Sequence, residues 1–249
     1  ENSPAVDDVT LLVIRSGDRG KTWSKPTVIN TLQSIGVSDP KTGEPVRTGD
    51  IGPSMAVNRE TGQLYVVWQD ARFSNHQRDA IAFSSSRDGG LTWSEPRRIN
   101  KATNVQAFTA AIDVTDNTIA VTHYDFRRDN TDPKVLLTDY WRLTSTNGGQ
   151  TWRESHIAGP FDMRKAPFAR GFFVGDYEGL GHTRNAFVPL FVLANSFNAT
   201  NPTDVFSSAV QDDESAGESA GESASQDGTR VPARSARDRL NSHRESRRE

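Results

Sequence analysis

Two short stretches of the sequence pair an aspartate with an arginine in the same way. Asp70 and Arg72 stand in "WQDARF", and Asp125 and Arg127 stand in "HYDFRR". A guanidinium presents a planar fork of N–H donors that suits bidentate binding of a carboxylate, so two such arginines could bind an acidic ligand. The alternative is that each Asp-x-Arg is an ion pair that stabilises its own loop and recurs because the chain is repetitive.

A second group of residues with chemical potential lies in two connecting segments. "RTGDIGPSM" contributes Arg47 and Asp50, and "PFDMRKAPFARGFFVGDYEGL" contributes Arg164, Arg170, Asp176, Tyr177 and Glu178. If residues 176–178 are extended, Asp176 and Glu178 point to one side and Tyr177 points to the other. Glu178 then cannot activate Tyr177, and a nucleophilic tyrosine would need a carboxylate from another part of the chain.

These residues must be positioned by a repeated framework, because one motif occurs three times. "SGDRGKTW" begins at Ser16, "SRDGGLTW" at Ser86 and "STNGGQTW" at Ser145, so the motifs start 70 and 59 residues apart. Asp or Asn followed by Gly is a hairpin signal, since Gly supplies a positive φ and the Asx side chain binds backbone amides of the turn. The tryptophan that ends each motif is expected to be a structural wedge.

Alternating apolar residues predict about four short strands in each interval, and no segment shows a helical period. The strands are expected at 9–16, 25–30, 53–58, 62–70, 79–86, 95–100, 108–114, 118–125, 134–145, 153–158, 171–180, 185–196 and 203–210. Four strands per repeat is the size of one β-propeller blade. The sequence therefore predicts an all-β chain with two complete blades, the outer half of an earlier blade and most of a later one.

The pattern Ser-x-Asp-x-Gly-x-Thr-Trp resembles the Asp box, or BNR repeat, of sialidases (neuraminidases) and related β-propellers. The resemblance covers residues 9 to about 210, and the third motif departs from it by having Asn147 in place of Asp. It implies a six-bladed propeller of four-stranded blades, of which this chain would be the C-terminal part. Residues 1–210 are thus expected to form a partial propeller, and the acidic and then arginine-rich segment 211–249 a disordered tail.

The same resemblance implies the chemistry of an exo-α-sialidase, which uses a tyrosine nucleophile, an aspartate that carries the proton and arginines that bind the acidic sugar. By residue type, Tyr177 or Tyr124 would be the nucleophile, and Asp70, Asp125 or Asp50 the proton carrier. Arg72, Arg127, Arg170 and Asp176 would bind the substrate. The Phe/Tyr-Arg-Ile-Pro motif of sialidases does not occur in these residues.

Composition argues against several other functions. The formal net charge is -3, so no overall field favours nucleic acid, and no apolar run approaches the roughly 20 residues of a membrane helix. The chain has no cysteine, and its five histidines lack metal-binding spacing, so neither a metal nor a cofactor is expected. The aspartates of "DFRRDNTD" lack EF-hand spacing and predict a solvated turn. Oligomeric state and compartment stay open, with secretion or a periplasmic location compatible with the composition.

The sequence leaves two functions. One is a glycoside hydrolase of the sialidase type, with a glycan as its substrate. The other is a non-catalytic propeller that binds a glycan or a protein. Arginines converging on one cavity with a carboxylate and a tyrosine would favour the enzyme, whereas arginines engaged in ion pairs within their own blades would favour the binding propeller.

Overall fold

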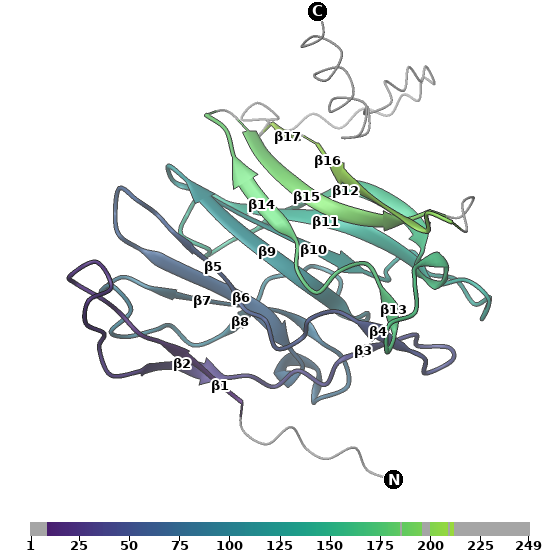
Figure 1. Ribbon diagram of the computed structural model, residues 1–249, viewed down its shortest axis with the longest axis horizontal. Helices are drawn as coiled ribbons and strands as arrows, with labels where there is room; N and C mark the ends of the chain where they lie inside the picture. Colours follow the sequence, from purple (N-terminus) through teal and green to yellow (C-terminus); the bar gives the residue numbers. More distant parts are fainter. Residues whose placement is uncertain (1–8, 185, 196–199, 209, 212–249) are drawn as a thin grey trace, which may run out of the picture. The chain divides into compact units, whose positions relative to one another are not determined.

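The computed structural model describes residues 9–184, 186–195, 200–208 and 210–211 (Figure 1). Contacts within the chain divide it into Glu1–Val210 and Gln211–Glu249. Apart from Gln211, the segment expected to be a disordered tail lies outside the described residues. None of the helices in the described part is long and apolar enough to cross a membrane.

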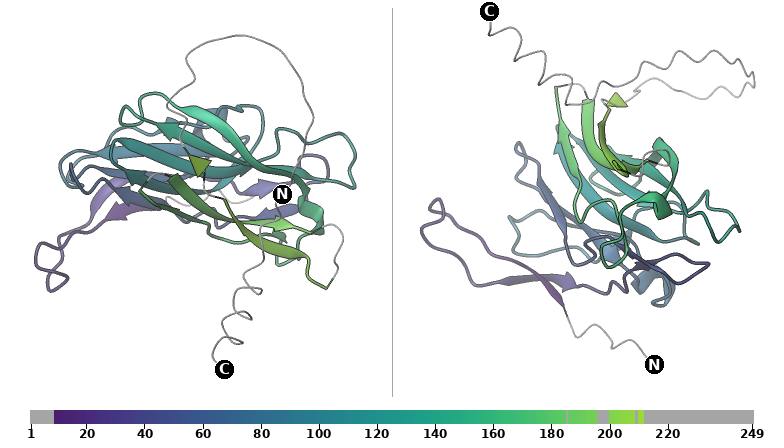
Figure 2. Two further views of the ribbon diagram at one scale, coloured as in Figure 1. Left: turned by 90° about the horizontal axis from the view of Figure 1, so that it is seen from above. Right: turned by 45° about the vertical axis from the view of Figure 1, so that its right-hand side comes forward.

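Two complete four-stranded antiparallel sheets form the centre of the first unit (Figures 1 and 2). In both, the order of the strands in the sheet follows their order in the chain, which is the meander of a propeller blade. The first sheet consists of β5 (Ser54–Val57), β6 (Leu64–Asp70), β7 (Ala80–Ser86) and β8 (Arg97–Arg98), and the second of β9 (Ala107–Thr115), β10 (Thr118–Asp125), β11 (Leu137–Ser145) and β12 (Arg153–Asp162).

Incomplete sheets flank these two blades. Together with the two complete sheets, they confirm the predicted fold class, an all-β chain of four-stranded propeller blades. Before them, β1 (Thr10–Val13) pairs with β2 (Thr27–Thr31) as an isolated ribbon. After them, β14 (Gly179–His182), β15 (Ala186–Ala194) and β16 (Thr203–Ser207) continue the antiparallel order, and β17 (Val210–Gln211) pairs with β15. The described residues contain no α-helix, only the 3-10 turns η1 (Arg72–Ser74) and η2 (Met163–Lys165).

The prediction of one continuous strand at 171–180 is wrong for the first part of that range. Here β13 (Phe172–Phe173) leaves the blade and pairs in parallel with β4 (Pro45–Arg47), which also pairs with β3 (Val37–Ser38). Positive φ values at Gly171 and Gly175 let the chain turn on either side of β13. The β3–β4–β13 sheet thus joins the segment between the β1–β2 ribbon and the first complete sheet to the segment between the second complete sheet and β14.

Apolar contacts between neighbouring sheets form the core. The side of the first complete sheet that carries Val67 and Phe83 packs on Ile112 and Leu143 of the second complete sheet. The opposite side, with Trp68 and other residues, packs on the β1–β2 ribbon. A third cluster joins the second complete sheet to β15 and includes Tyr124, Tyr140 and Phe191. Each sheet is therefore stabilised chiefly by its neighbours along the chain.

The three Asp-box turns have the hydrogen bonds that the motif predicts. In the second, Ser86 Oγ accepts from the Gly90 amide and donates to Asp88, whose carboxylate accepts from the amide and hydroxyl of Thr92. The third turn keeps the first two bonds with Asn147 in place of aspartate. Because these donors favour the ionised carboxylate, Thr92 most of all, they lower the pKa of Asp88 well below its usual value.

The tryptophans of the second and third boxes are wedges between sheets, whereas the tryptophan of the first box is not. Trp152 packs on Phe83 of the preceding complete sheet, with ring centroids 5.2 Å apart, and donates its indole N–H to Gly149 O. Trp93 packs on the cluster shared with the β1–β2 ribbon. Trp23 belongs to that ribbon, which is the first sheet of the described chain, and its side chain is 59% exposed.

This difference makes Trp23 and Trp152 a matched pair. Trp152→Ala should lower the free energy of unfolding by about 3 kcal/mol, because it removes an aromatic contact between sheets. Trp23→Ala should change it by less than about 0.5 kcal/mol, as is usual for an exposed side chain. Urea unfolding of both variants measures the difference, and equal losses would show that the box tryptophans act within their own hairpins.

Candidate functional site

In both repeated Asp-x-Arg motifs, the aspartate and the arginine form an ion pair with each other, at the ends of β6 and β10. Asp70 is fully buried; its carboxylate accepts from Arg72 Nε at 2.8 Å and from the indole N–H of Trp68. Asp125 is equally buried and accepts from Arg127 Nε at 2.7 Å. Hydrogen bonds therefore occupy two of the three carboxylates that the sequence nominated as proton carriers.

The two arginines are engaged as well. Arg72 also binds Asn30 and the carbonyl of Thr31 on the neighbouring ribbon. Arg127 binds Glu154 of its own sheet and lies over the ring of Trp141 at 3.7 Å. The structure thus does not bring Arg72 and Arg127 together at a free binding surface. This arrangement agrees with the alternative interpretation, a loop-stabilising ion pair that recurs in homologous blades.

Most residues nominated in the two connecting segments do converge on one pocket. Arg47, Asp50, Arg170, Asp176 and Tyr177 line one pocket of about 700 Å³, whose walls also include the apolar side chains of Ile35 and Ile51, exposed by 47% and 66%. The residues come from two segments far apart in the chain, 35–51 and 170–177. The parallel pairing of β4 with β13 holds these segments together.

A bidentate ion pair fixes the positions of two of these residues. Arg47 Nε donates to Asp176 Oδ1 at 2.8 Å, and its NH2 group donates to the other carboxylate oxygen. The Arg47 hydrogen bonds are the main cause that lowers the pKa of Asp176. Arg170, by contrast, is exposed and makes no ion pair with any residue that the structure describes. It is therefore the cation at this pocket that remains available to an anionic ligand.

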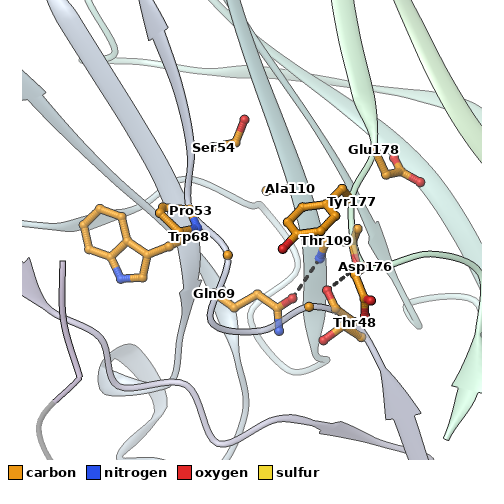
Figure 3. A pocket seen from close by; sticks show the side chains of 12 residues that line it. Thr48, Pro53, Ser54, Trp68, Gln69, Thr109, Ala110, Asp176, Tyr177 and Glu178 are labelled. Carbon is orange, nitrogen blue, oxygen red and sulfur yellow. Dashed lines mark hydrogen bonds between the residues drawn. The ribbon is translucent and has the colours of Figure 1, made fainter. Parts of the chain in front are cut away.

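Two glycines allow the segments to approach closely. A Cβ at Gly49, whose φ is +61°, would lie 2.2 Å from the carbonyl oxygen of Asp176, and a Cβ at Gly52 would lie 3.0 Å from Cε1 of Tyr177. Tyr177, 78% exposed, borders both the large pocket and a smaller one of about 80 Å³, which is drawn in Figure 3.

Tyr124 belongs to the core, and Glu178 is partly buried beside it, with its Oε2 atom buried. The Tyr124 ring is fully buried, and its hydroxyl donates to Val192 O at 2.7 Å and accepts from Val192 N. Tyr124 lines neither of the two pockets beside Tyr177. The carboxyl of Glu178 points away from the ring of Tyr177, as expected from their adjacent positions (Figure 3). Burial raises its pKa to about 8, an effect that the hydroxyls of Tyr124 and Tyr140 partly offset.

Sequence reasoning missed Asp79, which directly precedes β7. Its side chain is fully buried next to the large pocket and accepts from Ser34 Oγ at 2.6 Å and from the amide of Ile35 at 3.0 Å. Burial raises its pKa to about 6. An aspartate at the end of a polar loop gives no signal in a single sequence, because its burial depends on residues 34–35 folding over it.

The loop expected to be a solvated turn instead binds a lysine. Lys41 Nζ lies 2.7 Å from the carboxylate of Asp129 and donates to the carbonyl oxygens of Asn130 and Val135. Arg164 binds Asp39 and Glu44 in the same hairpin. These contacts attach the hairpin of β3 and β4 to the second complete sheet and thereby support the wall that carries Arg47.

Comparison with known proteins gives structural neighbours only. No protein-family model and no curated protein matches the sequence. An α-L-arabinofuranosidase of Fusarium graminearum, of family GH93 and in complex with arabinobiose, is 15% identical over 85% of this chain and 57% of its own, with a TM-score of 0.47. An α-L-arabinanase of Penicillium chrysogenum is 16% identical over the same shares, also with a TM-score of 0.47. A GH43 endo-arabinanase of Bacillus licheniformis is 9% identical over 85% of this chain and 68% of its own, with a TM-score of 0.43.

The chain thus spans little more than half the length of the two fungal neighbours. None of the three is named as a sialidase. The assignment to the propeller fold rests on the strand order of the chain itself.

The close approach at Gly49 can be tested against a glycine that has the same backbone conformation but open surroundings. Gly43 has a φ of +74° and nothing within 4 Å of a Cβ. Gly43→Ala should cost about 1 kcal/mol for the backbone alone. Gly49→Ala should cost at least about 2 kcal/mol more, because Asp176 must move. Urea unfolding measures both, and equal costs would show that the two segments separate easily.

The buried carboxyl of Glu178 predicts a specific pH dependence. Its pKa is 4.5 in the unfolded chain and about 8 in the folded one, so its stabilising effect is complete below pH 4.5 and is lost as the pH rises to 8. Glu178→Gln removes this loss. The variant should match the parent in stability at pH 4.5 and exceed it by about 4 kcal/mol at pH 8. The exposed Glu95→Gln is the control in urea unfolding, and a gain that is the same at both pH values would contradict the assignment.

Proposed function

We propose that this chain is the site-bearing part of a glycoside hydrolase that acts on a terminal acidic sugar, of which sialic acid is the first candidate. The observation that carries the proposal is the 700 Å³ pocket, where an arginine without an ion-pair partner in the described chain lies with two aspartates and an exposed tyrosine. These are the residue types that the Asp-box resemblance implies for binding a sugar carboxylate and cleaving its glycosidic bond.

In this proposal Arg170 binds the carboxylate of the sugar, because it is exposed at the pocket. Asp176 and Arg47 position each other through their bidentate pair. Tyr177 is the nucleophile, since its side chain borders the pocket and is 78% exposed. Asp50, which lines the same pocket, is the proton carrier in preference to Asp70 and Asp125, whose carboxylates are buried in ion pairs.

The second candidate is a non-catalytic propeller that binds a glycan or a protein. A specific observation favours it: Arg72 and Arg127 are engaged within the sheets or with the neighbouring ribbon. The two candidates share the pocket and the role of Arg170, and they differ in whether a bond is broken there.

The test combines hydrolysis of a fluorogenic sialoside with binding of free N-acetylneuraminic acid, measured by calorimetry. Arg170→Ala should weaken binding at least tenfold, because it removes a charge-assisted contact. Tyr177→Phe and Asp50→Asn should keep binding within about threefold and reduce hydrolysis at least 100-fold. Arg98→Ala, which changes an exposed arginine of β8 outside the pocket, is the control.

Each outcome separates the candidates. Binding without hydrolysis by the parent chain would support the binding propeller. Neither binding nor hydrolysis of the sialoside would overturn the choice of sugar. Hydrolysis that survives in Tyr177→Phe would remove the tyrosine from the mechanism.

A further inference from the structure

The walls of the pocket are joined behind it by a chain of hydrogen bonds that begins at Asp79. On one side, its carboxylate accepts from Ser34 Oγ at 2.6 Å and from Ile35 N at 3.0 Å. On the other side, it accepts from the side-chain amide of Gln69 at 3.2 Å. One buried carboxylate thus contacts both the segment that leads from β2 to β3 and the central strand β6.

The chain continues from Gln69 to the opposite wall. Gln69 Oε1 accepts from the amide of Thr109 at 3.0 Å, and the Thr109 hydroxyl donates to Thr48 O at 3.0 Å (Figure 3). Thr109 is β-branched but has a φ of +48°, a conformation that its surroundings must enforce. The hydrogen bonds with Gln69 and Thr48 are the local contacts that hold it there.

The hydrogen bonds from Asp79 lead in both directions to residues that line the two pockets. Ile35 and Thr48 line the large pocket, and Thr48, Gln69 and Thr109 line the small pocket beside Tyr177. The Asp50 carboxylate lies against Gly36, only 3.8 Å from where a Cβ would be, and the Gly36 amide donates to Ser34 Oγ. A shift of residues 34–36 would therefore move the surface on which Asp50 rests.

We propose that Asp79 is a positioning residue, which holds the Ser34–Gly36 wall and the Gln69–Thr109–Thr48 wall of the pocket in register. It does not itself line either pocket. It acts through residues 34–36 and Asp50 on one side. On the other side, it acts through Gln69, Thr109 and Thr48, which line the small pocket beside Tyr177. The inference deepens the proposed function, because these are the residues to which that function assigns the chemistry.

The charges around Asp79 set the direction of a pH effect. Asp50 faces it from the 48–53 segment, the Asp70–Arg72 pair lies beyond Gln33, and Arg78 precedes it in the chain. Burial is the main cause that raises the pKa of Asp79 to about 6, and the charge of Asp50 adds to it. Opening of the walls exposes Asp79 and returns its pKa toward 3.8, so opening becomes easier as the pH rises from 3.8 to 6.

Hydrogen–deuterium exchange tests the proposal without any ligand. In Asp79→Ala, the amides of residues 34–36 and 107–111 should exchange at least tenfold faster, while the box turn at 86–92 is unchanged. Asp88→Asn is the matched control, because it alters the exposed carboxylate of a box turn, at a position where the third box already uses Asn147. If Asp79→Ala does not fold, Asp79→Asn is used in its place.

The pH profile separates positioning from mere structural support. Between pH 5 and pH 7, the protection factors of residues 34–36 in the parent should fall about tenfold, and in Asp79→Asn they should stay constant. Unchanged wall exchange in Asp79→Ala, or a parent and Asp79→Asn with the same pH profile, would overturn the proposal.

A binding measurement distinguishes this inference from the proposed function. Asp79→Asn should raise the dissociation constant for N-acetylneuraminic acid severalfold, with Asp88→Asn unchanged. If the parent binds no acidic sugar while the exchange results are as expected, the proposed function fails and the role of Asp79 stands. If the parent binds the sugar and neither exchange nor affinity responds to Asp79→Asn, the role of Asp79 fails alone.

Discussion

The parallel pairing of β4 with β13 is the contact on which the site depends. It joins residues 46–47 to residues 172–173, more than 120 positions later in the chain, and Arg47 of this pairing forms the bidentate pair with Asp176. Two strand residues on each side supply few hydrogen bonds. Gly49 adds to them by letting the backbone of Asp176 approach where any side chain would collide.

Some arginines of the described chain form ion pairs with carboxylates, and at least one, Arg170, does not. Most arginines near the ends of β6 and β10 neutralise buried carboxylates, and removing either partner of such a pair would leave an uncompensated charge in the core. Arg170 differs because it is exposed at the rim of the pocket and has no ion-pair partner in the described chain. The arginine available at this pocket is therefore Arg170 and not an arginine of the repeated Asp-x-Arg motif.

Two buried acids show how neighbouring environments give similar groups different roles. Glu178 lies among aromatic side chains, and burial raises its pKa to about 8. Asp79 is fully buried but accepts three hydrogen bonds, and its pKa rises only to about 6. The first anchors the segment that presents Tyr177, and the second lies where residues 34–36 and the central strand meet.

The sequence by itself determined the repeats, the all-β class and the turn chemistry of the Asp boxes, because these depend on residues within about ten positions of one another. Ser86, Asp88 and Gly90 bind one another in any chain that forms this turn. It also nominated the residue types of the pocket, including Arg170, Asp176 and Tyr177. Only the tertiary structure decided that Arg72 and Arg127 are engaged, that Tyr124 is in the core and that Asp79 is buried. Those outcomes depend on which distant segments pack together, and local pattern carries no information about such contacts.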